Sequence, residues 1–224
     1  MSPHYILQYT AMNANDRAAK FMKLIYDRDE MGCDRFAKKY HDFYDVKVSI
    51  KYDENWIITP FLVACYIGYE TTINRMIEYG ADITVLDSLE WNALMLACDS
   101  RDREPINVVK ILINKYDVNI KNYHGESALT IAYKQLHWKT VEYLIDNNAD
   151  FATHIDMLTD YHSYNRSSSL EKSVKNMHNH IRDKYRQYII NVINNDQSVD
   201  NVIAECFRKT YVPQLVDIIA EFII

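Results

Sequence analysis

Glycine is scarce in this chain, which has only 4 among its 224 residues. A loop that binds phosphate groups through its backbone needs several closely spaced glycines, so the sequence excludes a nucleotide site of that kind. The Gly-x-Ser-x-Gly turn that exposes a catalytic serine is also missing. Groups of acidic residues, such as Asp27, Asp29 and Glu30, lie in polar turns, where solvated charge is the simplest interpretation. We therefore predict that the chain is not an enzyme and holds no cofactor.

Positive charge and long apolar runs are scarce as well. Lys and Arg total 25 against 31 Asp and Glu, and no basic stripe of the kind that binds nucleic acid is visible. The longest apolar runs, such as residues 56–65, fall well short of the ~20 residues that span a bilayer. The N-terminal residues have neither the charged start nor the long apolar core of a secretory signal. The composition therefore predicts a cytoplasmic protein, with the nucleus as an alternative, that binds neither nucleic acid nor membrane.

What the chain does contain is an internal repeat. Thr59, Asn92 and Ser127 each open a short apolar segment, and these openings are 33 and 35 residues apart. A second apolar segment with helical spacing follows each of them. An insertion of three residues within 100–105, and the loss of one residue near Tyr116, account for the unequal spacing. A unit of two short helices cannot bury its own apolar face, so we expect the copies to stack.

The first copy carries the most specific pattern. Thr59-Pro60 opens it, Ala64-Cys65 provides small residues, Gly68 ends its first helix, and Gly80-Ala81-Asp82 closes it. With a period of about 33 residues, this pattern resembles the ankyrin repeat family. The resemblance implies an all-α ankyrin-repeat solenoid made of helix-turn-helix repeats with short hairpin loops. It covers residues 53–152, as three repeats at approximately 53–86, 87–121 and 122–152.

A few positions depart from the family pattern. Leu62 and Tyr69 replace histidines, and the third copy has Leu136 where the family has a glycine, which puts in question how tightly that turn is made. His137 keeps the family histidine, whose side chain normally joins hydrogen bonds between neighbouring repeats. Cys65 and Cys98 occupy the same slot of successive copies.

Small core filler is the favoured role of these two cysteines. A zinc or disulfide role is the alternative, but it lacks His or Cys partners at ligand spacing, so we predict no metal site.

The flanking segments complete the domain organisation. Residues 1–52 are predicted to be a degenerate N-terminal repeat or cap, because Ala18, Met22 and Ile25 recur at helical spacing and the outer face is polar. Gly32 is the expected turn between its two helices. Residues 153–169 are predicted to be a loop, and residues 170–224 a C-terminal helical extension with a continuous apolar stripe.

The resemblance also implies a function. In the ankyrin family, partners are held by the hairpin tips before each repeat and by the exposed positions of the first helices. On this chain the tips offer Trp56, Ile58, Leu89, Trp91, Tyr123, His124 and Glu126, and the first helices offer Tyr66, Ile67, Asp99, Ser100, Lys134 and Gln135.

We therefore predict a protein-protein interaction module whose aromatic side chains bind the partner. Its acidic neighbours Glu90, Asp99 and Glu126 favour a partner with some basic character. The alternative for Trp56 and Trp91 is packing under the hairpins as core.

Two other functions are alternatives to the protein-protein interaction module. Residues 211–219 resemble the F-box-like helices that close ankyrin proteins of large DNA viruses, so residues 211–224 would couple a bound target to a ubiquitin ligase and take part in host-virus interaction. An enzyme with a C-terminal site would have to use His154, His162, His178, His180 and Cys206. His178 and His180 are two apart on the expected helix, so their rings point in different directions and cannot share a metal.

Overall fold

The computed structural model describes residues 12–50, 53–100 and 104–151, together with positions 175–177, 179–184, 186, 187, 190 and 191. These residues fall into two compact units. Unit 1 is the described chain up to Lys115 together with Asn122–His124, and unit 2 is Tyr116–Lys121 and the described chain from Gly125 onward.

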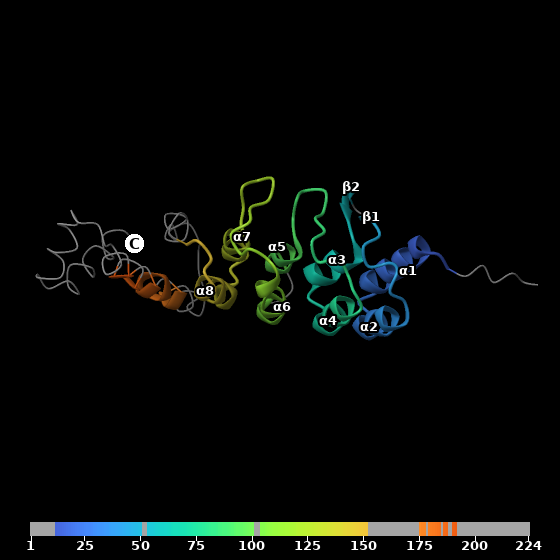
Figure 1. The fold of residues 1–224 in the computed structure, drawn as a ribbon, viewed down its shortest axis with the longest axis horizontal. Helices are drawn as coiled ribbons and strands as arrows, with labels where there is room; N and C mark the ends of the chain where they lie inside the picture. The colour runs from blue at the N-terminus through green and yellow to red at the C-terminus, as the bar shows by residue number, and fades with distance from the viewer. Residues whose placement is uncertain are drawn as a thin grey trace, which may run out of the picture. The chain divides into compact units, whose positions relative to one another are not determined.

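The described part of unit 1 contains helices, one short sheet and one 3₁₀ helix (Figure 1). Their order is α1 (Ala14–Tyr26), α2 (Glu30–Lys39), β1 (Val48–Ile50), β2 (Asp53–Ile58), α3 (Pro60–Ile67), α4 (Glu70–Glu78), α5 (Ala93–Cys98), α6 (Ile106–Leu112) and η1 (Ile113–Lys115). Helices α1, α3 and α5 lie side by side in one layer, and α2, α4 and α6 lie side by side in a second layer.

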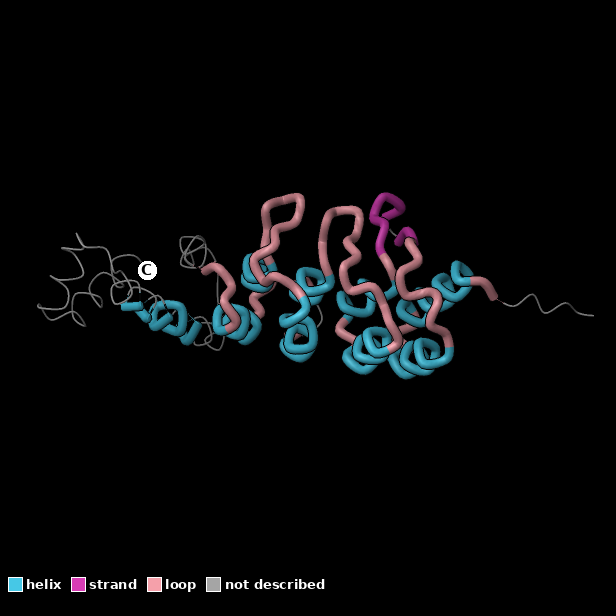
Figure 2. The backbone as a smooth tube through the Cα atoms, in the orientation of Figure 1, coloured by secondary structure: helices cyan, strands magenta, loops and turns pink. Residues whose placement is uncertain are grey.

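Two loops of unit 1 project to the same side of the helices (Figure 2). The first, here called the first finger, is the antiparallel hairpin of β1 and β2, in which Val48 is opposite Ile58 and Ser49 is opposite Ile57. The second finger is the loop of residues 82–91 between α4 and α5. These fingers are the hairpin tips that the sequence predicted before the repeats.

The repeat openings act as helix N-caps. The hydroxyl of Thr59 accepts a hydrogen bond from the backbone N–H of Leu62 (3.3 Å), and the side-chain oxygen of Asn92 accepts one from Met95 (2.9 Å). Such caps satisfy N–H groups that have no partner within the helix. Each apolar segment therefore begins as a helix at the residue where the sequence pattern begins.

Residues in the left-handed conformation end several of the helices of unit 1, and one of them is not a glycine. Gly68 (φ 85°) and Gly80 (φ 91°) take the left-handed conformation after α3 and α4, and Arg28 (φ 56°) takes it after α1. In each case the next residue donates its N–H to a carbonyl five residues back, as Asp29 does to Leu24 (3.0 Å) and Tyr69 to Ala64 (3.1 Å). This is the Schellman arrangement, which normally uses glycine.

The turn between α1 and α2 was expected at Gly32, and that expectation is wrong. Arg28 makes the turn, and Gly32 lies buried in the first turn of α2, where its N–H donates to the Asp29 carboxylate (2.8 Å). A Cβ at position 32 would lie 2.1 Å from Oδ2, the other oxygen of that carboxylate. Gly32 is therefore a packing requirement of the α2 cap.

Unit 2 repeats the same construction. Its described helices include α7 (Ala128–Lys134) and α8 (Trp138–Asp146), and Ser127 caps α7 together with Thr130. Leu136 (φ 62°) stands where the family has a glycine, yet His137 still donates its N–H to Ala132 O (3.0 Å). The substitution therefore leaves the turn as tightly closed as the one at Gly68.

Part of the C-terminal extension is described within unit 2. Its residues 175–177 and 179–184 are helical, with Met177 and Ile181 of the apolar stripe buried. Lys184 Nζ lies 2.7 Å from Asp146 Oδ1 at the end of α8. The loop predicted at 153–169, the inserted positions 101–103 and residues 192–224 lie outside the described residues.

Small residues and cysteines fill the centre of the repeats. Ala64 and Ala97 of unit 1 and Ala132 of unit 2 are completely buried. Cys33, Cys65 and Cys98 are buried and free, and burial raises the pKa of the Cys33 thiol to about 12. Because a thiol and not a thiolate is present at neutral pH, these side chains act as small apolar core groups.

Candidate functional site

A buried carboxylate organises the second finger. Asp87 Oδ2 accepts a hydrogen bond from Trp56 Nε1 (2.7 Å), while Oδ1 accepts from the backbone N–H groups of Leu89 and Trp91 (2.8 Å each). Asp87 therefore folds the tip of the second finger and fixes the indole of the first finger at the same time. This is why Trp56 is held in place without being completely buried.

The backbones of the two fingers are also joined. Ser88 donates its N–H to Ile57 O (2.9 Å), and its side-chain oxygen accepts from Ile57 N (3.0 Å). The outer side of β2 is therefore occupied by the second finger. Fingers that are hydrogen-bonded to each other present their side chains in a fixed arrangement, which lowers the entropy cost of binding.

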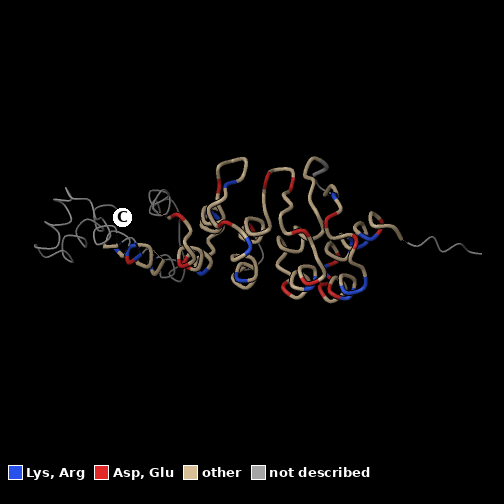
Figure 3. The backbone as a smooth tube through the Cα atoms, in the orientation of Figure 1, with Lys and Arg blue, Asp and Glu red and all other residues tan. Residues whose placement is uncertain are grey.

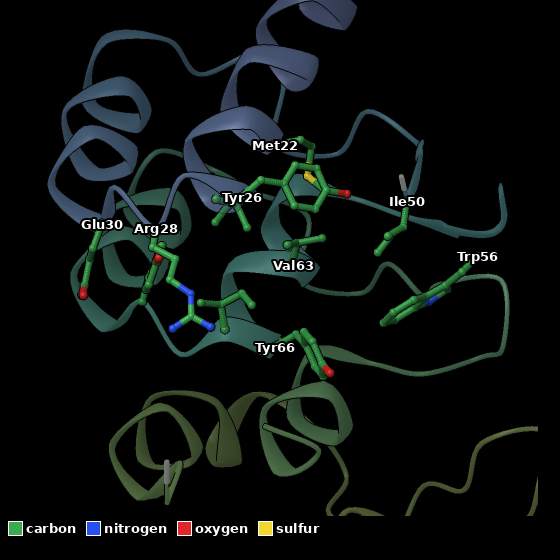
Figure 4. Close-up of a pocket in the computed structure, with 11 residues that line it drawn as sticks. Met22, Tyr26, Arg28, Glu30, Ile50, Trp56, Val63 and Tyr66 are labelled. Carbon is green, nitrogen blue, oxygen red and sulfur yellow. The ribbon is translucent and has the colours of Figure 1, made fainter. Parts of the chain in front are cut away.

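A cavity of about 540 Å³ lies between the first finger, α1 and α3 (Figure 4). Most of the side chains around it are aromatic or aliphatic, and two are charged. They are Met22, Ile25, Tyr26, Arg28, Glu30, Ile50, Trp56, Val63, Tyr66, Ile67 and Tyr69. Its volume falls within the range of ligand-binding pockets, ~300–1,000 Å³.

The aromatic rings give this cavity its shape. The rings of Trp56 and Tyr66 meet edge to face, with centroids 5.9 Å apart and planes at 83°. Arg28 extends toward Tyr66, whereas Glu30 lies on the far side of Arg28, away from Trp56 (Figure 4). The cavity therefore combines apolar walls with one inward-pointing cation.

The predicted contact residues of unit 1 fall into three groups. Trp56, Tyr66 and Ile67 line the cavity. Leu89 at the tip of the second finger is 42% exposed, and Tyr123 is 74% exposed. Side chains with intermediate or high exposure complete the set, namely Trp91, Asp99 and His124.

Two of the predicted contact residues are buried and cannot touch a partner in this conformation. Ile58 is 1% exposed, because it directly precedes the cap of α3 at the point where β2 enters the core. Ser100 is 2% exposed, just after the end of α5. The alternative of packing under the hairpins was raised for Trp56 and Trp91, and both side chains are only partly covered.

The remaining predicted residues belong to unit 2. Glu126 and Lys134 form an ion pair with each other, and Gln135 is half-buried after the end of α7. The carboxylate of Glu126 was predicted to favour a basic partner, but Lys134 already compensates its charge. The acidic character expected of the site therefore depends on Glu90 and Asp99.

Sequence reasoning missed the contribution of α1 to the cavity. Met22, Tyr26 and Arg28 were assigned to a cap whose role was stability, yet all three line the cavity. The position of α1 within the repeat pattern could have indicated this role. If residues 1–52 are a degenerate repeat, then α1 is its first helix, and its exposed positions belong to the same face as those of α3.

Some of the histidines considered for metal binding or catalysis lie among the described residues. Among the described residues, no group of three or more His, Cys, Asp and Glu side chains is placed to hold a metal ion. His180 Nε2 lies 3.2 Å from Asp146 Oδ1, and His137 is buried at the start of α8. The other residues of the alternative enzyme site, and residues 211–224, lie outside the described residues.

None of the helices in the described part of the chain combines the length and the apolar character that crossing a bilayer requires.

Short paired helices with projecting fingers define a helical-repeat protein. The family model for ankyrin repeats, in three copies, matches residues 47–155. Residues 47–155 thus carry ankyrin repeats, and the helical architecture is consistent with an all-α ankyrin solenoid. Over 97 residues it is also 26% identical to an ankyrin repeat and KH domain-containing protein of Caenorhabditis briggsae, a match that spans 42% of this chain and 4% of that relative. Ankyrin repeats are generally protein-protein interaction modules and are typically non-enzymatic.

Proposed function

We propose that this chain binds a partner protein through the fingers and first helices of unit 1, without catalysing a reaction. The observation that carries the proposal is the cavity lined by Trp56, Tyr66 and Ile67, three residues nominated from the sequence pattern. Partly exposed aromatic side chains on a rigid support offer large contact area at little entropy cost, as in the hot spots of known interfaces.

The contact surface extends beyond the cavity. Leu89 and Tyr123 are exposed apolar side chains, and Trp91, Asp99 and His124 complete the proposed set in unit 1. Glu90 and Asp99 favour a partner with basic groups near the second finger. Glu126, Lys134 and Gln135 of unit 2 stay in the proposal as sequence-based candidates.

The proposal includes a cytoplasmic site of action. Cys33, Cys65 and Cys98 are free thiols in the described residues, which suits a reducing compartment. The ubiquitin-ligase adaptor remains a sequence-based alternative for residues 211–224.

The first test uses the exposed contact residues, because their loss disturbs the fold least. The native partner is first identified by proximity labelling and purified, and its affinity for the full chain is measured by calorimetry. We expect the double variant Leu89→Ala/Tyr123→Ala to weaken binding by at least about 2 kcal/mol, which is the cost of truncating a single hot-spot residue. Thermal melting of the variant should match that of the wild type.

The matched control is Met31→Ala, which truncates an exposed apolar side chain on α2, in the other helix layer. It should leave the affinity unchanged. Equal losses in the control and the double variant would contradict the proposed surface, as would wild-type affinity of the double variant.

A further inference from the structure

A second cavity adjoins the first along α1. Its volume is about 420 Å³, and it lies between Ala19, Met22 and Tyr26 of α1 and the segment Lys47, Val48 and Ser49 at β1. Met22 and Tyr26 line both cavities. The two hollows therefore adjoin along α1 and share these side chains as a common wall, and together they are here called the α1 groove.

The strand beside this groove has a free edge. Among the described strands, β1 pairs only with β2, and the other side of β2 is hydrogen-bonded to Ser88 of the second finger. The backbone groups on the outer side of β1 are thus left without a strand partner. A groove that runs beside such an edge suits a peptide in extended conformation, which adds its own backbone hydrogen bonds to the sheet.

The charge around the α1 groove differs from that of the whole chain, whose net charge is −6. Arg28 and Lys47 line it, against the single carboxylate Glu30. Lys23 lies on the same helix face as Ala19 and Tyr26, which are four residues before it and three after it. Basic positions are visible on α1 and before β1 in Figure 3.

Two of these cations are available to a ligand. Lys23 and Lys47 are exposed, and neither forms an ion pair with any residue that the structure describes. Asp27, at the end of α1, lines neither cavity. A basic peptide would meet like charges along this groove, whereas an acidic one would meet complementary charges.

We propose that the α1 groove binds an extended, acidic peptide segment of the partner protein, with an aromatic or aliphatic anchor in the cavity beside Tyr26, Trp56 and Tyr66. Alternate side chains of an extended peptide point to opposite sides, so one set enters the groove while acidic side chains between them reach Lys23, Arg28 and Lys47. This inference rests on the proposed function and adds the chemistry of the partner at this end of unit 1.

The test is a selection of binders from a random displayed-peptide library on the full-length chain. Selected peptides are synthesised, and their affinities are measured by fluorescence anisotropy. We expect them to combine acidic residues with an aromatic or aliphatic residue. Their affinity should fall about tenfold, or about 1.4 kcal/mol, for Lys23→Glu/Lys47→Glu, because two exposed charge interactions are lost, and it should fall with added salt.

The matched control is Lys38→Glu/Lys115→Glu, which makes the same change in net charge at exposed positions on α2 and η1. Affinity retained in the control and lost in the groove variant would support the inference. An equal loss in both variants would overturn it, because net charge and not the groove would then govern binding.

A third variant separates this inference from the proposed function. Tyr66→Ala removes an aromatic wall of the cavity without changing the charge. If the selected peptides are basic or neutral and lose affinity with Tyr66→Ala, the acidic specificity is wrong and the proposed binding surface stands. If acidic peptides bind but are insensitive to Tyr66→Ala and to the groove charges, the α1 groove is not their site. If no binder is sensitive to Tyr66→Ala, the proposed function fails at this cavity.

Discussion

At the scale of single residues, carboxylates and amides tie each finger or turn to its neighbour. Asp45 Oδ1 accepts the N–H of Asp82 (3.1 Å) in unit 1, and Asn119 Oδ1 accepts the N–H of Asp150 (2.7 Å) in unit 2. The two bonds are alike, but only the first uses a charged acceptor. An amide side chain is therefore sufficient for the contact.

The charge of Asp45 should make the stability of unit 1 depend on pH. The pKa of this carboxyl is raised: partial desolvation is the largest cause, the Asp82 charge adds to it, and the hydrogen bond from the Asp82 backbone N–H opposes it. A folded-state pKa above the unfolded one means that ionisation costs stability. This cost is absent below the ordinary carboxyl pKa and is complete above the folded-state value.

We therefore expect Asp45→Asn to be more stable than the wild type at neutral pH. The gain should be small, because Asp45 is exposed and solvent screens its charge. It should disappear as the pH falls below ~4, where the wild-type carboxyl is neutral as well. Urea denaturation at pH 7 and at pH 3 measures the difference in the free energy of unfolding between the variant and the wild type. If the variant is still the more stable one at pH 3, the cause is not electrostatic.

At the scale of elements, the helix ends explain how the chain manages with so little glycine. Arg28, Leu136 and Asn148 take the left-handed conformation at helix ends, with φ values of 56°, 62° and 67°. A non-glycine residue in this conformation costs of order 1 kcal/mol. The surrounding hydrogen bonds hold the turns closed despite this cost.

Two substitutions at these ends should act in opposite directions. Gly68→Ala places a Cβ on a buried left-handed residue and should destabilise the chain by at least about 1 kcal/mol. Asn148→Gly relieves strain at an exposed position and should stabilise it by up to ~0.5 kcal/mol. Denaturant unfolding followed by circular dichroism measures both. Equal stability of Gly68→Ala and the wild type would show that the left-handed turn after α3 is not under strain.

The elements also show what the sequence could and could not predict. Thr59, Asn92 and Ser127 were nominated as openings, and all three are helix N-caps, because capping and helical spacing are local properties. The turn at Arg28 was missed because residues other than glycine rarely adopt its conformation.

The candidate site was less predictable because it depends on contacts between distant residues. The bond from Trp56 to Asp87 joins residues 31 apart, and the groove needs α1 to lie beside β1 and α3. No spacing pattern encodes these distances. The pattern therefore identified the face and several of its residues, but neither the burial of Ile58 and Ser100 nor the role of α1.

At the scale of the whole molecule, the stability of each repeat should depend on its contacts with the neighbouring repeats. Ala97 is completely buried in α5, which packs against α3 and α6. A carboxylate at this position would have no partner and no access to water. Because each repeat is stabilised by the next, the damage should extend beyond α5 to its neighbours.

We expect Ala97→Asp to destabilise the chain by about 3–5 kcal/mol, as an uncompensated buried charge typically does. The thermal melting temperature from circular dichroism should fall accordingly, with loss of helical signal well beyond the six residues of α5. Asn114→Asp adds the same charge at an exposed position of η1 and should melt like the wild type. Unchanged melting of Ala97→Asp would argue against the stacked core.

Arg28 links the three scales, since one residue both ends a helix in an unfavourable backbone conformation and supplies a cation to the α1 groove. Replacing it with glycine would relax the chain and at the same time remove a charge from the groove. Selection for a more stable fold would therefore favour glycine at position 28, whereas selection for tighter binding would favour arginine. A library of variants at position 28 could be selected once for thermal stability and once for ligand binding. The two selections should enrich different residues at this position.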